Sequence, residues 1–245
     1  MIGSHHISLD TVDSTNLHAR ELLREGAAEG TVVSALHQTA GRGRKDRSWT
    51  DRPGQNLLAS YMLKPKREPA EWGGVPLMTG LAALRALRGF VPLDIHLKWP
   101  NDVFVGDRKI AGILTESVSV AGTSWIIAGI GINLNQTEFD GTYRHPPTSL
   151  LLESGRPCDP NDMLTALSKE LDVLYGLWQK QGNPPVLDLW KQQTRMLGAR
   201  VHIEEEGQIR TATAIGISGE GALVVRADDG KTEQIFAGDV SIAVK

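Results

Sequence analysis

Runs of apolar and mixed positions along the chain predict a series of strands and helices. Short apolar runs predict buried strands at 31–36, 56–63, 95–99 and 125–134. Apolar residues at helical spacing predict four helices, which begin after residues 13–16, near Val75, at Pro160 and at Pro184. The last of these helices is expected to run to Met196. Strands and helices mixed in this order predict an α+β core.

A β-hairpin is predicted at 103–115, because Gly106-Asp107 suits a two-residue turn between two apolar runs. Strict alternation along its second strand places Lys109, Ala111 and Ile113 on one face, and Ile110, Gly112 and Leu114 on the other. Lys109 would then suit placing one cation against a buried substrate oxygen. A lysine on a solvent-facing edge is the commoner arrangement, and the pattern alone leaves both open.

The pattern changes beyond Gly198. Short alternating runs are separated there by glycine-containing turns, which predicts a small antiparallel barrel of about 50 residues. The expected organisation is therefore a core domain over 1–196 and a β domain over 197–245.

Composition narrows the possible classes of protein. The chain has 245 residues and a formal net charge of -3, which argues against a general nucleic-acid binder. Its single cysteine, Cys158, excludes an internal disulfide and fits a reducing compartment. No apolar run approaches the length of a membrane span, and the start lacks a signal-peptide pattern, so a soluble cytoplasmic protein is expected. His5 and His6 have no nearby third ligand, which favours a flexible terminal pair over a metal site.

The segment 38–49 carries four cations within six residues, two glycines and a closing Trp49. Glycine allows close backbone approach to a ligand, and arginine supplies planar donors for phosphate or carboxylate oxygens. Because like charges repel at this spacing, the segment is interpreted as a loop that orders around an anion. A solvated basic turn or a nucleic-acid patch is an equally open interpretation of this segment alone.

Two further motifs are candidates for chemistry. The first is Lys98-Trp99-Pro100-Asn101-Asp102, in which Asn101 and Asp102 could also be an ordinary turn pair after a proline. The second is the glycine-rich run 129–133, which ends in Asn133. It lacks the third glycine of a dinucleotide fingerprint, and the chain has no Gly-x-x-x-x-Gly-Lys-Ser/Thr phosphate loop.

Taken in order, these motifs resemble those of biotin protein ligases. The matching segments are Asp13-Ser14-Thr15-Asn16, Gln38-Thr39, Gly41-Arg42-Gly43-Arg44, residues 98–102, residues 107–114 and residues 129–133. The resemblance implies a biotin/lipoate ligase-like catalytic domain with an SH3-like C-terminal barrel. It does not extend to an N-terminal winged helix-turn-helix, so the chain resembles the monofunctional ligases. One departure is Asp46, which stands where the family's loop often has a glycine.

The resemblance also implies roles for individual residues. Biotin contacts are expected from Ser14, Thr15, Asn16, Gln38, Arg42, Gly43, Arg44, Lys109, Gly112 and Leu114. Nucleotide contacts are expected from Arg42, Arg44, Trp49, Asn101 and Asn133, and catalytic roles from Lys109, Arg44 and Asp102. Apolar walls are expected from Ile113, Leu114 and Ile132, and no metal site made of protein ligands is expected.

The implied reaction has two steps, in which ATP activates biotin to biotinyl-5′-AMP and a lysine of an acceptor protein then takes the biotinyl group. The expected cofactors are ATP with Mg²⁺, held mostly by phosphates and water. The expected partner is a biotin carboxyl carrier protein or domain, with no DNA and no membrane, and a homodimer is possible. Two alternatives are a lipoate protein ligase of the same fold and a non-enzymatic nucleic-acid-binding protein.

Overall fold

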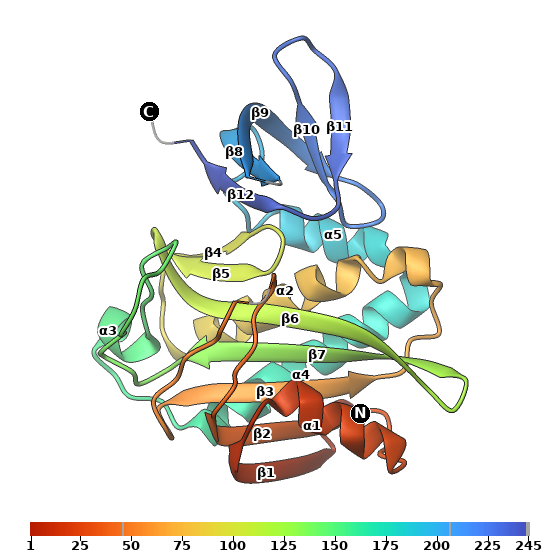
Figure 1. Cartoon of the computed structure of the whole chain (residues 1–245), viewed down its shortest axis with the longest axis vertical. Helices are drawn as coiled ribbons and strands as arrows, with labels where there is room; N and C mark the ends of the chain where they lie inside the picture. The colour runs from red at the N-terminus through yellow and green to blue at the C-terminus, as the bar shows by residue number, and fades with distance from the viewer. Residues whose placement is uncertain (46, 206, 244–245) are drawn as a thin grey trace.

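The computed structural model describes residues 1–45, 47–205 and 207–243. Asp46, the one departure from the expected loop motif, lies outside these ranges. Within them the chain forms a larger core and a smaller C-terminal β domain, which lies at one end of the core (Figure 1). The expected α+β architecture is confirmed.

The core is built on a seven-stranded sheet with the order β1-β2-β3-β7-β6-β5-β4 among the described residues. β1 and β2 are parallel, and the remaining neighbours are antiparallel. The strands are β1 (His5–Val12), β2 (Thr31–Gln38), β3 (Asn56–Leu63), β4 (Ile95–Lys98), β5 (Asp102–Val105), β6 (Arg108–Val120) and β7 (Thr123–Asn133).

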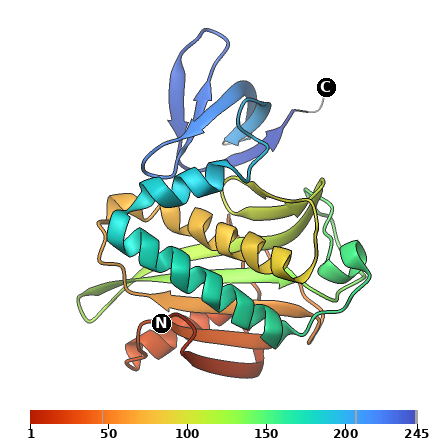
Figure 2. The same ribbon diagram turned by 180° about the vertical axis from the view of Figure 1, so that it is seen from behind.

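Helices cover the two faces of this sheet unequally. The helices are α1 (Thr15–Arg24), α2 (Gly74–Phe90), α3 (Leu150–Ser154), α4 (Pro160–Gln181) and α5 (Asn183–Lys191), with a short 3-10 turn at Pro69–Glu71. Figure 2 shows α2, α4 and α5 packed over one face of the sheet. On the other face α1 lies over β2, β3, β7 and part of β6, and Ala19 and Leu23 pack on Val33, Met62 and Ile127. The rest of that face carries loops, so a site can form there.

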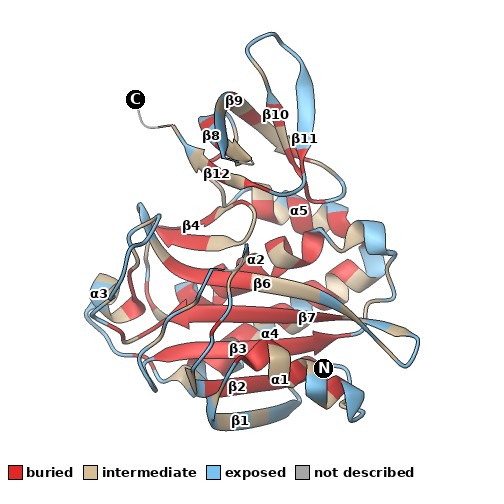
Figure 3. Ribbon diagram, viewed as in Figure 1, coloured by how far each residue is buried: buried red, intermediate tan, exposed pale blue. Residues whose placement is uncertain are grey.

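The apolar pattern located most elements correctly, because all of β3 and most of β7 are buried in the middle of the sheet (Figure 3). The predicted strand 56–63 is β3, all of whose residues are buried. The predicted helix at Pro160 is α4, where Asp159 caps the first turn by accepting a hydrogen bond from the amide of Asn161. The Gly106-Asp107 turn joins β5 and β6 as expected.

Two expectations about the ends of elements were wrong. The helix predicted to reach Met196 ends at Lys191, because the backbone around Thr194 turns to pair with Leu97 of β4. His5 and His6 are not a flexible terminal pair, since both belong to β1 and pair in register with Thr31 and Val32 of β2. β1 was not predicted, because its apolar signal is limited to Ile7, Leu9 and Val12, none of which is fully buried.

The C-terminal domain is a five-stranded antiparallel sheet, with the order β11-β10-β9-β8-β12 among the described residues. Its strands are β8 (Arg200–Glu205), β9 (Gln208–Ile217), β10 (Leu223–Arg226), β11 (Thr232–Ile235) and β12 (Asp239–Ile242). The short alternating runs predicted four of these strands. β12 was missed because only Val240 of its four residues is buried.

A buried asparagine joins the two parts of the molecule. The side-chain carbonyl of Asn183, at the start of α5, accepts a 2.7 Å hydrogen bond from the indole of Trp178. Its amide donates to the carbonyl of Gly219 in the C-terminal domain at 2.8 Å. Nearby, the indole of Trp99 donates to the carbonyl of Gly221 at 3.0 Å. These bonds fix the C-terminal domain against the helical layer and the start of β5. No helix within the described ranges is long and apolar enough to cross a bilayer.

Substitution of Asn183 should therefore loosen this joint. We expect Asn183→Ala to lower the free energy of unfolding by about 2–4 kcal/mol, because it leaves two buried groups without partners. Calorimetric melting of the variant measures this loss. Asn161→Ala, at an exposed position of α4, is the matched control and should melt like the unmodified chain.

Candidate active site

A row of residues crosses four strands of the sheet on the face that α1 leaves open. Lys98 pairs with Asp102, Asp102 with Gly112, and Gly112 with Gly131. Residues directly opposite each other on neighbouring strands have side chains on the same face. The register thus brings a cation, a carboxylate and two glycines into one line, which borders a cavity of about 460 Å³.

Lys109 joins this face through a β-bulge. Val103 pairs with Ala111 but Phe104 pairs with Lys109, so Ile110 is an extra residue with no partner on β5. The bulge reverses the predicted alternation, because Lys109 now shares a face with Gly112 rather than with Ala111. The Lys109 ammonium lies 2.7 Å from Oδ1 of Asp102, in an ion pair rather than a well-directed hydrogen bond.

The two glycines form a flat surface that holds the ring of Trp49. A Cβ atom added at Gly131 would lie 2.4 Å from the indole, and one at Gly112 would lie 2.9 Å from it. The Lys109 ammonium is 5.6 Å from the ring centroid, within range of a cation–π interaction. The indole nitrogen of Trp49 is buried and has no hydrogen-bond partner within residues 1–45, 47–205 and 207–243. Trp49 therefore lies inside the cavity, as the sequence prediction allowed.

The end of the cavity next to α1 is polar. The amide and the hydroxyl of Thr15 both lie close to Oε1 of Gln38, at 2.8 and 3.0 Å. The hydroxyl of Ser60, on β3, is 2.8 Å from that of Thr15 and 2.6 Å from Oδ1 of Asn16. These groups are buried and offer both donors and acceptors. Of the residues predicted to bind the ligand head, Ser14, Thr15, Asn16 and Gln38 all line this end.

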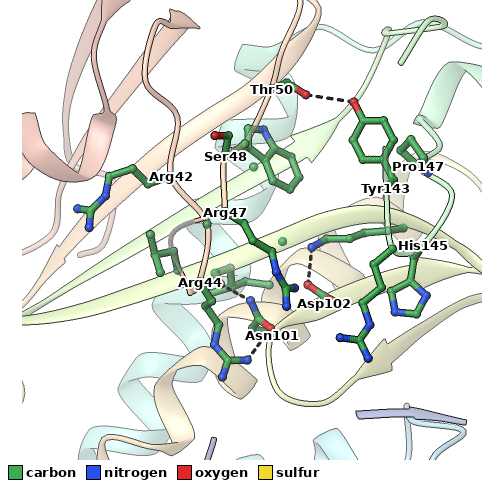
Figure 4. Close-up of a pocket in the computed structure, with 18 of the residues that line it drawn as sticks. Arg42, Arg44, Arg47, Ser48, Thr50, Asn101, Asp102, Tyr143, His145 and Pro147 are labelled. Carbon is green, nitrogen blue, oxygen red and sulfur yellow. Dashed lines mark hydrogen bonds and ion pairs between the residues drawn. The ribbon is translucent and has the colours of Figure 1, made fainter. Parts of the chain in front are cut away.

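The segment 38–49, called the basic loop from here on, crosses the middle of the cavity. Figure 4 shows its Arg44 beside Asn101. The guanidinium of Arg44 donates to Oδ1 of Asn101 at 3.2 Å. Asn101 in turn donates to the carbonyl of Ile113 at 2.7 Å, which ties the loop to β6. Desolvation lowers the pKa of Arg44, although Asp239 and Asp102 oppose the shift. Asn101 is thus a support for Arg44 and not a simple turn residue.

Arg42 does not point the same way as Arg44. In Figure 4 it extends away from the other labelled arginines. Its guanidinium donates to the Glu116 carboxylate of β6 at 3.2 Å. Arg42 borders the cavity, but its charge is used in this ion pair.

The C-terminal domain reaches the same cavity through Asp239 of β12. Its carboxylate pairs with Lys45 at 3.4 Å, with Arg144 at 3.1 Å and with Arg47. Burial acts to raise the pKa of Asp239, but the hydrogen bond from Arg47 and the three neighbouring cations outweigh burial and lower it. One carboxylate therefore anchors both the basic loop and the segment that carries Arg144.

Lys98 is the cation of the row, and its pKa is shifted. Desolvation lowers the pKa of its ammonium to about 8, with Asp102 opposing the shift and Lys109 and Arg144 adding to it. The ammonium is 5.5 Å from the ring centroid of Phe104. A buried lysine whose charge is this costly is a good candidate for contact with an anionic ligand.

Several predicted residues have structural contacts as well. The side-chain amide of Asn133 donates to the backbone carbonyl of Thr148 at 2.9 Å. The backbone amide of Gly43 donates to the backbone carbonyl of Arg47 at 2.7 Å. Gly43, Asn133, Gly112 and Leu114 all border the cavity. The predicted wall residue Ile132 does not, because it belongs to the apolar core beneath the helices. Ile113 borders the cavity, but its side chain packs toward Gly80 of α2.

Sequence reasoning missed five residues of this site, namely Lys98, Ser60, Glu116, Arg144 and Asp239. Lys98 belongs to the motif at residues 98–102, but the sequence does not predict the desolvation of its ammonium. The other four come from segments that carry no motif. Together the site offers a polar end, a flat middle and a cluster of cations, which fits a long ligand with a hydrogen-bonding head and an anionic tail.

Comparison with known proteins agrees with this geometry. The family model described as "Biotin/lipoate A/B protein ligase family" matches residues 8–133, and the one described as "Biotin protein ligase C terminal domain" matches residues 196–242. A biotin–[acetyl-CoA-carboxylase] ligase of Mycobacterium tuberculosis is 32% identical, over 97% of this chain and 90% of that protein. The bifunctional ligase/repressor BirA of Bacillus subtilis is 29% identical, over 99% of this chain and 75% of that protein.

Solved structures show the same fold. A biotin protein ligase from Aquifex aeolicus in complex with biotin and ATP has a TM-score of 0.85 and 28% identity, covering 98% of this chain and 100% of that one. A biotin protein ligase from Leishmania major in complex with biotinyl-5-AMP has a TM-score of 0.67 and 25% identity, covering 95% and 98%. The expected ligase-like fold with its small C-terminal domain is thereby confirmed, and the chain belongs to the biotin/lipoate protein ligase family.

Proposed function

We propose that this chain is an ATP-dependent biotin protein ligase that forms biotinyl-5′-AMP and transfers biotin to a lysine of a biotin carboxyl carrier protein or domain. The observation that carries the proposal is the row of Lys98, Asp102, Gly112 and Gly131, with Lys109 and Arg44 beside it. The row connects a polar end to a cationic end across one continuous cavity. The match to a C-terminal domain of biotin ligases favours biotin over lipoate as the substrate.

The polar end suits the cyclic urea of biotin, which has two N–H donors and a carbonyl acceptor. Buried Thr15 and Asn16 and the partly exposed Gln38 supply hydrogen-bonding groups there. The glycine surface at Gly112 and Gly131 would take an apolar ring and tail if the Trp49 ring moved aside or stacked on them. The tail would then direct the carboxylate toward Lys109 and Arg44.

The cationic end suits the first chemical step. An oxygen of the biotin carboxylate attacks the α-phosphorus of ATP, a P–O bond to pyrophosphate breaks, and biotinyl-5′-AMP forms. Negative charge gathers on the reacting oxygens, so fixed cations in a water-poor site lower the barrier. Lys109 and Arg44 are suited to these positions, and Lys98 adds a third cation at the cavity. Mg²⁺ would arrive with ATP and be held mainly by its phosphates.

The second step needs a neutral lysine of the acceptor. Its Nζ attacks the acyl carbon of the anhydride, the acyl C–O bond breaks, and AMP leaves with the phosphate oxygen. Asp102 is suited to orient this lysine or accept its proton, since its carboxylate lies at the cavity in contact with Lys109. The loop that carries Arg44 and Trp49 lies across the cavity and would shield the anhydride from water before the acceptor arrives.

Transfer to an acceptor tests the proposal directly. A carrier domain incubated with the chain, biotin and MgATP should gain the mass of one biotinyl group, seen by mass spectrometry of the intact domain. Lys109→Met should slow this gain by about 100-fold, because it removes one charge from the reacting oxygens. Gain of a lipoyl group but not of a biotinyl group under matched conditions would contradict the proposal.

Arg44→Ala should separate formation of the intermediate from its retention. We expect this variant to bind biotin but to release biotinyl-5′-AMP into solution, because the loop loses its contact with Asn101. Chromatography of protein-free filtrates after reaction measures the released adenylate. Arg226→Ala, at an exposed position of β10, is the matched control. Adenylate that stays as tightly bound in Arg44→Ala as in the unmodified chain would contradict the shielding role.

Lys98 should give the reaction a high-pH limit. Its pKa of about 8 means that the ammonium is charged below this pH and becomes neutral above it. We therefore expect kcat/KM for ATP to fall as the pH rises through about 8, since this parameter reports the free enzyme. Lys98→Met should lower kcat/KM by about 10-fold or more and remove that limb of the profile. Lys180→Met, on the outer surface of α4, should keep both.

A further inference from the structure

Glu116 is a partly buried acid on β6 that receives hydrogen bonds from three residues, two of α1 and one of the basic loop. Its Oε2 accepts from the amide of Asn16 at 2.8 Å. Its Oε1 accepts from Arg20 of α1 and from Arg42 of the basic loop, each at 3.2 Å. The side chain is only 17% exposed. The two arginines compensate the charge of Glu116, so the contact with Asn16 can be held inside the protein.

This contact decides which way the amide of Asn16 faces. An ionised carboxylate has only acceptors, so the NH₂ group of Asn16 must face Glu116. The carbonyl of Leu114, 3.3 Å away, accepts from the same NH₂ group. Oδ1 of Asn16 must then face the hydroxyl of Ser60, which is 2.6 Å away.

The orientation of Asn16 leaves the polar end of the cavity short of protons. Three close oxygen–oxygen contacts run from Asn16 through Ser60 and Thr15 to Gln38, at 2.6, 2.8 and 3.0 Å. The hydroxyls of Ser60 and Thr15 supply only two protons for these three contacts. One contact is therefore left without a proton, so an oxygen of that contact can accept an N–H from a ligand.

The opposite orientation of Asn16 would remove this property. Its NH₂ group would donate to Ser60, Ser60 to Thr15, and Thr15 to Gln38, so every contact would have a proton and none would need one from a ligand. Glu116 prevents this arrangement, since Oδ1 of Asn16 would then lie 2.8 Å from a carboxylate oxygen.

We propose that Glu116 is a positioning and specificity-determining residue, which fixes Asn16 so that the end of the cavity accepts hydrogen bonds from the N–H groups of the ligand. The inference rests on the proposed function, in which that ligand head is a cyclic urea. Glu116 does not touch the ligand. Its effect reaches the ligand through Asn16 and the hydroxyls of Ser60 and Thr15.

The test moves the carboxylate from position 116 to position 16 and the amide from position 16 to position 116. In Glu116→Gln the new amide can pair with Asn16 in either orientation, so we expect the Kd of biotin, from isothermal titration, to rise about tenfold. In Asn16→Asp two carboxylates face each other, and biotin should bind more weakly still. The double variant Glu116→Gln/Asn16→Asp restores an obligatory acceptor facing Ser60. It should bind biotin at least threefold more tightly than either single variant.

Two measurements distinguish this role from a general effect on folding. Desthiobiotin keeps the cyclic urea but lacks the sulfur ring, so its Kd should rise by the same factor in Glu116→Gln, while kcat at saturating biotin changes by less than threefold. Glu170→Gln, which alters a carboxylate paired with Arg85 in the helical layer, is the matched control and should leave both values unchanged. Recovery in the double variant excludes unfolding as the cause of the loss.

The outcomes separate this inference from the proposed function. An unmodified chain that gives no biotin-dependent exchange of pyrophosphate into ATP would contradict the proposed function itself. Normal exchange by the unmodified chain, together with an unchanged Kd of biotin in Glu116→Gln, would overturn only the role of Glu116. Failure of the double variant to bind more tightly than the single variants would also overturn it.

Discussion

The site depends on the register of four antiparallel strands and on one extra residue in the third of them. The register places Lys98, Asp102, Gly112 and Gly131 in one row across β4, β5, β6 and β7. Without the bulge at Ile110, Lys109 would share a face with Ala111, which lies in the apolar core beneath the helices. An ammonium held there would lose its hydration without a partner. The bulge turns the same residue toward Asp102 and the open face.

Carboxylates from outside the basic loop divide its cations into two groups. Asp239 of the C-terminal domain holds Lys45 and Arg47, and Glu116 of β6 holds Arg42. Arg44 instead contacts the neutral amide of Asn101 and keeps its charge available at the cavity. These pairs reduce the repulsion within the loop. Among the described residues no carboxylate pairs with Arg44, which lies where an anion can bind. The small β domain contributes to this arrangement although its own strands lie outside the core.

Local patterns in the sequence predicted most of the fold and much of the site, but not the features that depend on pairing. The buried runs fixed β3 and β7, and the motif residues Thr15, Gln38, Arg44, Asp102 and Lys109 do meet around one cavity. The bulge could not be predicted, because it results from a shift between β5 and β6 that leaves the apolar pattern of β6 unchanged. Glu116 and Asp239 were missed since a lone acid in a strand resembles a surface residue until its partners, about 70 to 190 positions away, are known.

Trp49 links the state of the cavity to the position of the basic loop. The indole lies on Gly112 and Gly131, so a ligand on that surface has to displace the ring or stack against it. Trp49 and Arg44 are five positions apart in one loop, and the amide of Trp49 donates to the carbonyl of Gly41 at 2.8 Å. A shift of the ring therefore moves the segment that carries Arg44. Because glycine at both positions is what allows the ring to lie so close, any side chain there would separate the loop from the sheet and open the cavity to water.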